Sequence, residues 1–135
     1  MDQVEVEGLA TVEKEILLAH SQDLVNKVKS ESESCRDQES KQNSNKEYYY
    51  CNKSQKAAYL SASAVVTGTK KILDKSYESG YCIVRPPGHH ANKDESLGFC
   101  LFNNAAVAAK VAMKEPHNLK KICIFDWDIH HGDGT

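Results

Sequence analysis

Two short apolar runs separated by a helical segment constrain the fold of this chain more than any other feature. The runs occupy residues 81–84 (YCIV) and 122–125 (ICIF), and both suit buried strands. Between them lies an alanine-rich segment that Asn103 or Asn104 can cap and that extends through Met113. Strand, helix and strand in this order form a βαβ unit. The sequence therefore predicts an α/β fold with a parallel sheet flanked by helices.

The loop that follows each predicted strand is rich in histidine and aspartate. Residues 88–90 read Gly-His-His after the first run, and residues 126–133 read DWDIHHGD after the second. In open α/β sheets, ligands bind at the carboxyl ends of the strands, so we expect both loops to meet at one rim although roughly 40 residues separate them.

The residues before the first strand predict three helices and one polar loop. Apolar residues recur at helical spacing in 11–20, and Ser21 can cap a second short helix that follows. Residues 30–46 are too polar to offset their ordering entropy by burial, which predicts a mobile surface loop. Ser54 then precedes a long amphipathic helix that ends before Gly80.

Composition excludes several classes of function. At 135 residues the chain fits one small domain or part of a larger one, and 17 Lys and Arg against 19 Asp and Glu leave no broad cationic surface for nucleic acid. The sequence has no apolar run of membrane-spanning length and no secretory signal, which predicts a soluble intracellular protein. Its five cysteines show no C-x-x-C spacing and are expected to be reduced thiols.

The aspartate and histidine at alternate positions of the second loop suit a metal ion. Side chains at i and i+2 of an extended segment point to the same side, so Asp128 and His130 could present a carboxylate oxygen and an imidazole nitrogen to one ion. Zinc is the leading candidate. A catalytic zinc site usually has about three protein ligands, so one ligand is still to be found.

The remaining polar residues of the two loops suit proton transfer beside such a metal. Zinc lowers the pKa of bound water, and a histidine oriented by a carboxylate can accept a proton and return it to a leaving amine. His89 and His90 supply the imidazoles, and Asp126 and Asp133 are suitably placed carboxylates. A His-His pair alone is more often a loop or capping feature, and Asp-x-Asp is common at strand ends. Their combination favours a hydrolytic centre, whereas the isolated His20 suggests a structural role.

Three motifs, in this order and spacing, resemble the class II histone deacetylases. They occupy residues 85–91 (RPPGHHA), 98–104 (GFCLFNN) and 126–132 (DWDIHHG), and weaker similarity extends through 16–21 and 56–60. The resemblance implies the arginase/deacetylase fold, of which residues 1–135 would form part of the catalytic domain.

The resemblance also implies a role for each matching residue. Asp128 and His130 would be zinc ligands, His90 the general base and acid, and His89 an electrostatic partner oriented by Asp126. Phe99 would form one wall of the acyl-lysine channel beside the Gly98 carbonyl, and backbone oxygens of 126–130 would hold a structural potassium ion. Asp133 departs from the pattern, because class II members usually carry Asn there.

The implied reaction is hydrolysis of N-acetyl-lysine on histone or other protein tails. The resemblance also implies a role in chromatin regulation and transcription repression and a corepressor complex as partner. It implies residence in the nucleus, the cytoplasm or both. Family catalytic domains are more than twice this long and carry the third zinc ligand, an Asp, further downstream. We therefore expect this chain alone to be inactive or nearly so. A non-catalytic interaction module and an acetylpolyamine deacetylase of the same fold are the alternative readings.

Overall fold

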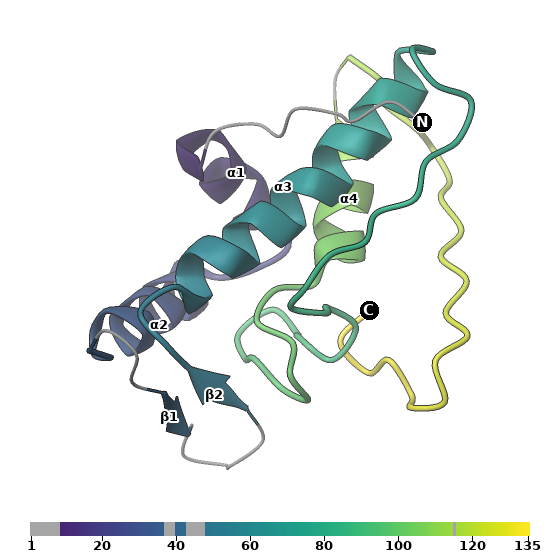
Figure 1. Cartoon of the computed structure of the whole chain (residues 1–135). Helices are drawn as coiled ribbons and strands as arrows, with labels where there is room; N and C mark the ends of the chain where they lie inside the picture. The colour runs from purple at the N-terminus through teal and green to yellow at the C-terminus, as the bar shows by residue number, and fades with distance from the viewer. Residues whose placement is uncertain (1–8, 37–39, 43–47, 115) are drawn as a thin grey trace.

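The computed structural model describes residues 9–36, 40–42, 48–114 and 116–135. Its elements follow the order α1, α2, β1, β2, α3, α4 (Figure 1). They span Leu9–Ile16 (α1), Gln22–Glu33 (α2), Lys41–Gln42 (β1), Tyr49–Tyr50 (β2), Ser54–Leu73 (α3) and Asn104–Ala112 (α4).

The four helices confirm the helical predictions. Ser21 caps α2, where its side chain accepts a hydrogen bond from the Leu24 N–H, and the helix leaves an apolar face buried. Of the two candidate caps for α4, Asn103 is the one used, because its side chain accepts a hydrogen bond from the Ala106 N–H. Helix α3 begins at Ser54 and ends at Leu73, well before Gly80.

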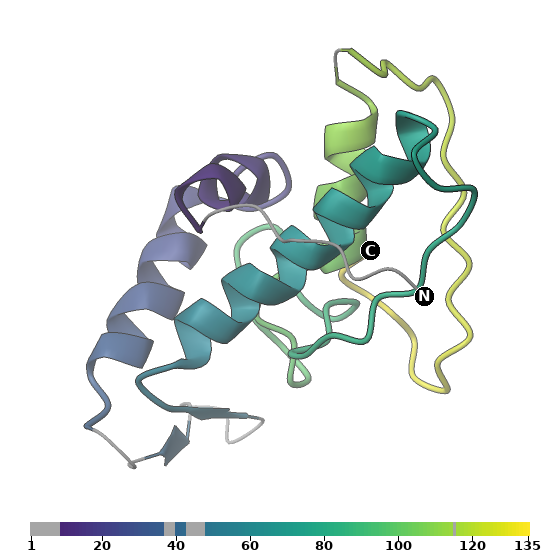
Figure 2. The same cartoon turned by 45° about the horizontal axis from the view of Figure 1, so that its top comes forward.

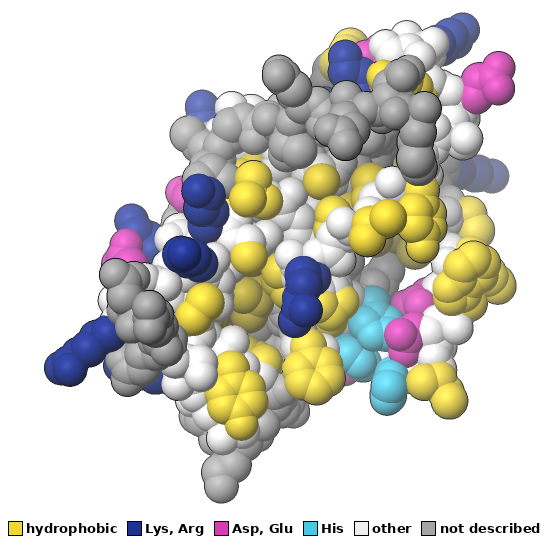
Figure 3. All heavy atoms as spheres, in the orientation of Figure 1, with side chains coloured by type: hydrophobic (Ala, Val, Ile, Leu, Met, Phe, Trp, Pro, Cys, Tyr) yellow, Lys and Arg dark blue, Asp and Glu magenta, His cyan; other side chains and the backbone are white. Residues whose placement is uncertain are grey.

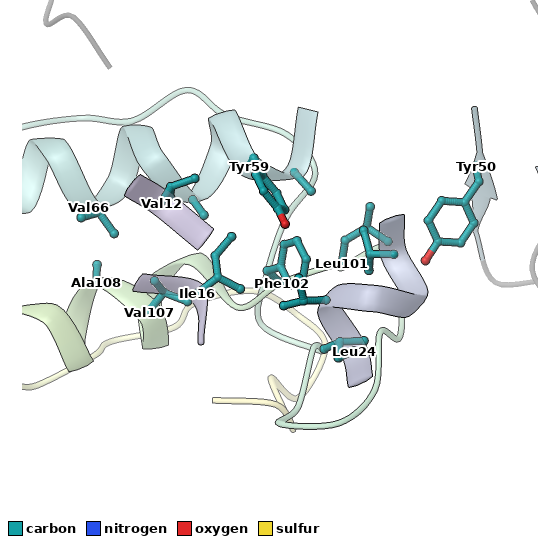
Figure 4. Packing of buried hydrophobic residues seen from close by; sticks show 14 of the residues in the cluster. Val12, Ile16, Leu24, Tyr50, Tyr59, Val66, Leu101, Phe102, Val107 and Ala108 are labelled. Atoms are coloured by element: carbon teal, nitrogen blue, oxygen red, sulfur yellow. The ribbon is translucent and has the colours of Figure 1, made fainter. Parts of the chain in front are cut away.

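The core surrounds α3, the longest helix, which contacts α1, α2 and α4. Figure 4 shows Val12 and Ile16 of α1, Val66 of α3 and Val107 of α4 pointing toward one another. Each of these four side chains is fully buried, as is Phe102 just before α4. Burying side chains of this size contributes roughly 1.5–3 kcal/mol each, so this contact between helices is a substantial part of the core.

The two predicted strands are the main correction. Residues 81–84 and 122–125 are extended and run in the same direction along one side of the molecule, as Figures 1 and 2 both show. Neither belongs to a sheet: within the described ranges the one ladder is antiparallel and pairs β1 with β2. A strand needs a hydrogen-bonded neighbour. Here Ile83 and Phe125 are 87% and 81% exposed, so the apolar runs are not buried as predicted.

The predicted polar loop at 30–46 is also wrong in part. Residues 30–33 continue α2, and Lys41–Gln42 forms β1, whose register places Lys41 opposite Tyr50. Residues 37–39 and 43–46 lie outside the described part of the chain, so the predicted mobility of the loop stays a prediction.

Two predictions from composition can be compared with the fold. All five cysteines are described, and each is a free thiol. No helix in the described residues is both long enough and apolar enough to pass through a membrane.

Candidate functional site

The first histidine-bearing loop is docked against the beginning of α4. The Pro86 carbonyl accepts hydrogen bonds from the Ser61 hydroxyl at 2.9 Å and from Asn104 Nδ2 at 3.2 Å. Because Ser61 lies on α3 and Asn104 begins α4, both helices fix the chain three residues before His89. This loop therefore reaches the site from the helical core rather than from a sheet.

The second loop is shaped by its own aspartates. The Asp128 N–H donates to Asp126 Oδ1 at 3.1 Å, and the His130 N–H donates to Asp128 Oδ1 at 2.8 Å. These two consecutive turns through aspartate side chains curl residues 126–130 back toward the first loop.

Direct backbone contact joins the two loops. The Gly134 N–H donates to the His89 carbonyl at 2.9 Å. A Cβ on Gly134 would lie only 2.7 Å from the carbonyl carbon of His90, so a residue without a side chain is required for this approach.

The loops bring both histidines onto aspartates, as the sequence predicted. His89 Nδ1 lies 2.8 Å from Asp126 Oδ2, and His90 Nδ1 lies 2.6 Å from Asp133 Oδ1. The His89 and His90 rings are 4.1 Å apart, and His130 is 6.1 Å from His90 between ring centroids. Figure 3 shows these histidine and acidic side chains gathered on one face. Residues distant in sequence thus form one polar cluster.

Hydrogen bonds keep the three aspartates ionised. The His90 ring lowers the pKa of Asp133, and the Asp128 N–H together with the His89 ring lowers the pKa of Asp126. The backbone N–H and ring of His130 lower the pKa of Asp128. Ionised carboxylates on Nδ1 of His89 and His90 favour the tautomer in which Nε2 carries no proton.

Asp128 and His130, the two predicted metal ligands, are hydrogen-bonded to each other. Asp128 Oδ1 and His130 Nδ1 are 2.9 Å apart, and the two side chains remain 48% and 72% exposed. Two tetrahedral zinc ligands, each about 2.0 Å from the ion, would be about 3.3 Å apart, so this pair does not have the spacing of a zinc-bound pair. Within the described residues, no group of three or more histidine, cysteine or acidic side chains is arranged to hold a metal.

Gly98 and Phe99 lie in a tight turn against His90. Both have positive φ angles, 49° and 65°, and the turn is closed by an isolated bridge between Leu97 and Cys100. The Cα hydrogen of Gly98 faces the imidazole: a Cβ there would lie 2.8 Å from His90 Cγ. Phe99 is 67% exposed, so its ring projects into solvent beside the cluster.

An open cavity of about 390 Å³ extends from the cluster between the two extended segments. Its lining includes Val84 and Pro87 of the first segment, Ile124 of the second, and His89 and Asp126 of the cluster. The cavity gives the first histidine-aspartate pair access to a ligand of moderate size.

Two residues near the site, Asn103 and His20, have contacts that the sequence did not reveal. Asn103, predicted only as a helix cap, also donates to Thr135 Oγ1 at 2.9 Å. His20 is buried, and its ring joins the Asn92 carbonyl to the Asn103 N–H. The predicted structural role of His20 agrees with these contacts, but no periodicity or spacing indicates its partners.

Comparison with known proteins identifies the family. The histone deacetylase domain profile matches residues 2–135. Histone deacetylase 18 of Arabidopsis thaliana is 47% identical over 132 residues, which cover 95% of this chain and 19% of that protein. Histone deacetylase HDA1 of Candida albicans is 41% identical over 124 residues, covering 90% of this chain and 15% of that protein. The chain thus spans about a fifth of the length of the first relative.

A solved structure agrees with the profile and with the two relatives. The crystal structure of the HDA15 HD domain superposes with a TM-score of 0.81 at 34% identity, and covers 99% of this chain and 35% of that one. The likeness confirms the arginase/deacetylase fold that the resemblance implied, although the parallel sheet is not formed within the described residues. On the match of its profile, its relatives and its structure, the chain belongs to the histone deacetylase family.

Proposed function

We propose that the clustered histidines and aspartates serve a zinc-dependent hydrolase that removes acetyl groups from lysine side chains of histone or other protein tails. The observation that carries the proposal is the pair of histidine-aspartate hydrogen bonds beside Asp128 and His130. Two oriented imidazoles next to two adjacent metal-binding side chains are the parts that metal-assisted amide hydrolysis requires.

The donor chemistry suits zinc. One carboxylate oxygen and one imidazole nitrogen, 2.9 Å apart, would supply two of the ligands, and a third is expected outside the described residues. Zinc, when bound, would polarise the acyl carbonyl and make water more acidic. The family's structural potassium ion would be held by backbone oxygens of residues 126–130.

His90 is the proposed general base and general acid. Asp133 accepts its Nδ1 proton at 2.6 Å, which leaves Nε2 to take a proton from the attacking water and return it to the lysine amine. His89, oriented by Asp126 in the same way, would be the electrostatic partner of His90.

Phe99 and Gly98 are the proposed channel residues. The exposed Phe99 ring offers an apolar surface to the methylene stem of an acyl-lysine. Gly98, packed against His90, would present its backbone carbonyl to the substrate amide. Both assignments predict that substrates with a long linear stem are preferred over compact amides.

The 135-residue chain by itself is proposed to have little or no activity, because its described residues offer two of about three expected ligands. Substrate proteins, a corepressor complex and a nuclear or cytoplasmic location are proposals for the whole protein. They rest on the family alone.

The test compares full-length protein with the 135-residue chain, each supplied with zinc, on an acetyl-lysine peptide. His90→Ala should lower kcat by about 10²–10⁴, the usual contribution of a general acid-base residue. His117→Ala is the matched control, because that histidine lies outside the cluster. Activity that survives His90→Ala would refute the mechanism, and faster turnover of acetylspermidine than of the peptide would replace the substrate class with acetylpolyamines.

Metal binding is tested separately by zinc titration monitored calorimetrically. Asp128→Asn and His130→Ala should each weaken binding by at least about tenfold, whereas Asp94→Asn, on an exposed loop, should not. Equal affinities for all variants would exclude these ligands whatever the enzyme activity.

A second candidate function rests on the two extended segments. Tyr81, Ile83, Phe125 and Trp127 are each more than four-fifths exposed, and the backbones that carry them are not in a ladder within the described residues. Unpaired extended segments of this kind bind other chains, which suits a non-catalytic interaction module. Gel filtration that shows a zinc-bound monomer at all concentrations would count against it.

A further inference from the structure

Asn103 makes more contacts than a helix cap needs. Its Oδ1 caps α4 by accepting from the Ala106 N–H at 3.0 Å, and its carbonyl accepts from the Val107 N–H. Its backbone N–H donates to His20 Nε2 at 2.9 Å. The side chain is 1% exposed, so each polar atom has lost water and depends on these partners.

The Nδ2 group of Asn103 lies between the two loops of the polar cluster. It donates to Thr135 Oγ1 at 2.9 Å and, over a longer distance of 3.4 Å, to the Ala91 carbonyl. Ala91 directly follows His90, and Thr135 comes two residues after Asp133. One amide group therefore joins the chain beside the histidine to the chain beside its aspartate.

His20 forms hydrogen bonds at both ends of residues 92–103, the segment that follows the histidine pair. Its Nδ1–H donates to the Asn92 carbonyl at 2.8 Å, and its Nε2 accepts from Asn103. Asn92 and Asn103 are the two ends of the segment that carries Gly98 and Phe99. Burial lowers the pKa of His20, which keeps the ring neutral and Nε2 able to accept.

We propose that Asn103, supported by His20, is a positioning residue that holds the hydrogen bond between His90 and Asp133. The amide Nδ2, rather than the capping oxygen, performs this role. Aspartate and serine cap helices as well as asparagine does, so capping alone does not require an amide at this position. The catalytic consequence rests on the proposed deacetylase function, but the geometric claim does not.

The first variant is Thr135→Val, which keeps the shape of an exposed side chain and removes the oxygen that Asn103 binds. The loss of one hydrogen bond changes an opening equilibrium constant about fivefold. We expect hydrogen exchange of the Gly134 amide and of the His90 Nδ1 proton, followed by NMR, to become about fivefold faster. Exchange of the Val66 amide in α3 should not change. Thr135→Ser keeps the hydroxyl and should restore the original rates.

The second variant, Asn103→Ser, retains a side-chain cap and removes the Nδ2 donor without placing a carboxylate that could accept from the Thr135 hydroxyl. Its effect on Gly134 exchange should not add to that of Thr135→Val in the double variant, because both remove the same bond. Ser32→Ala, which breaks a buried hydrogen bond to Cys51 far from the site, is the control for general destabilisation.

Unchanged exchange of Gly134 and His90 in Thr135→Val, or full additivity with Asn103→Ser, would overturn the positioning role. In full-length protein, Thr135→Val should lower kcat about fivefold and leave KM unchanged, since Phe99 and Gly98 are not altered. An inactive wild type would instead refute the proposed function, and the exchange rates would still decide the role of Asn103.

Discussion

Replacing Gly98 by alanine should damage the site through its effect on the His90 ring. Gly98 has a φ of 49°, in the region where an L-residue costs roughly 1–2 kcal/mol. The new Cβ would lie 2.8 Å from His90 Cγ, whereas nonbonded carbons prefer about 3.5–4.0 Å. Cγ must therefore move by about 0.7–1.2 Å, and Cδ2, which the new Cβ would approach more closely still, by more than that. A displacement of about 1 Å can reduce the rate of a positioned reaction about 10²-fold.

Two measurements separate the steric effect from general instability. Urea unfolding should show a loss of about 1–2 kcal/mol, and kcat of the full-length protein for an acetyl-lysine peptide should fall by about 10²-fold. The matched control is Gly68→Ala inside α3, where the new Cβ meets Cys82 Sγ at an ordinary 3.4 Å. That change should stabilise the protein by about 0.5–1 kcal/mol. A Gly98→Ala protein with unchanged His90 NMR shifts and unchanged kcat would refute this reasoning.

Three further predictions address stability and protonation. Phe102→Ala should cost about 3–5 kcal/mol in urea unfolding, because the ring is fully buried against His20 and Tyr59; a loss below 1 kcal/mol would show that the site is not well packed. Ser21→Ala should cost about 0.5–1 kcal/mol and Ser21→Asp almost nothing, since only alanine removes the cap of α2. The pKa of Asp133 lies below its ordinary 3.8, so its bond to His90 stabilises the fold above that pH and is lost as pH falls through the lowered pKa; carbon NMR titration of Asp133 at or above 3.8 would contradict this.

The helices could be predicted because their signals are local. Apolar spacing and the caps at Ser21 and Asn103 depend on residues within a few positions of each other, and the structure has α2 and α4 where these signals place them. Helix α3 begins at Ser54 itself rather than after it, and its N-cap Lys53 makes no side-chain capping hydrogen bond.

The strands could not be predicted in the same way, because a strand exists only with a hydrogen-bonded partner. The apolar runs at 81–84 and 122–125 correctly indicated extended backbone with a common direction. The runs did not indicate which segment would form hydrogen bonds with either of them, and neither run is paired within the described residues. The two-residue strand β1 was missed because Lys41 and Gln42 lie in a polar segment without alternation.

The histidine-aspartate pairs were predictable because both partners are visible in the sequence and the chain order implied their meeting. The contacts that hold these pairs in place were not predictable. Asn103 looks like an ordinary helix cap, and nothing local in the sequence links it to Thr135 or to His20. Contacts that depend on packing between distant segments become apparent only once the fold brings those segments together.

The position of the site follows from these supports rather than from strand pairing. The first loop is tied to α3 and α4 through Pro86, the second is tied to the first through Gly134 and His89, and Asn103 joins both to the helix cap. The distances of 2.8 and 2.6 Å in the two histidine-aspartate pairs are therefore maintained without a ladder at 122–125. Because Asn104 holds the first loop and Asn103 holds Thr135 of the second, both from the start of α4, unfolding of that helix should release both pairs together, and hydrogen exchange at Gly134 should follow exchange at Val107.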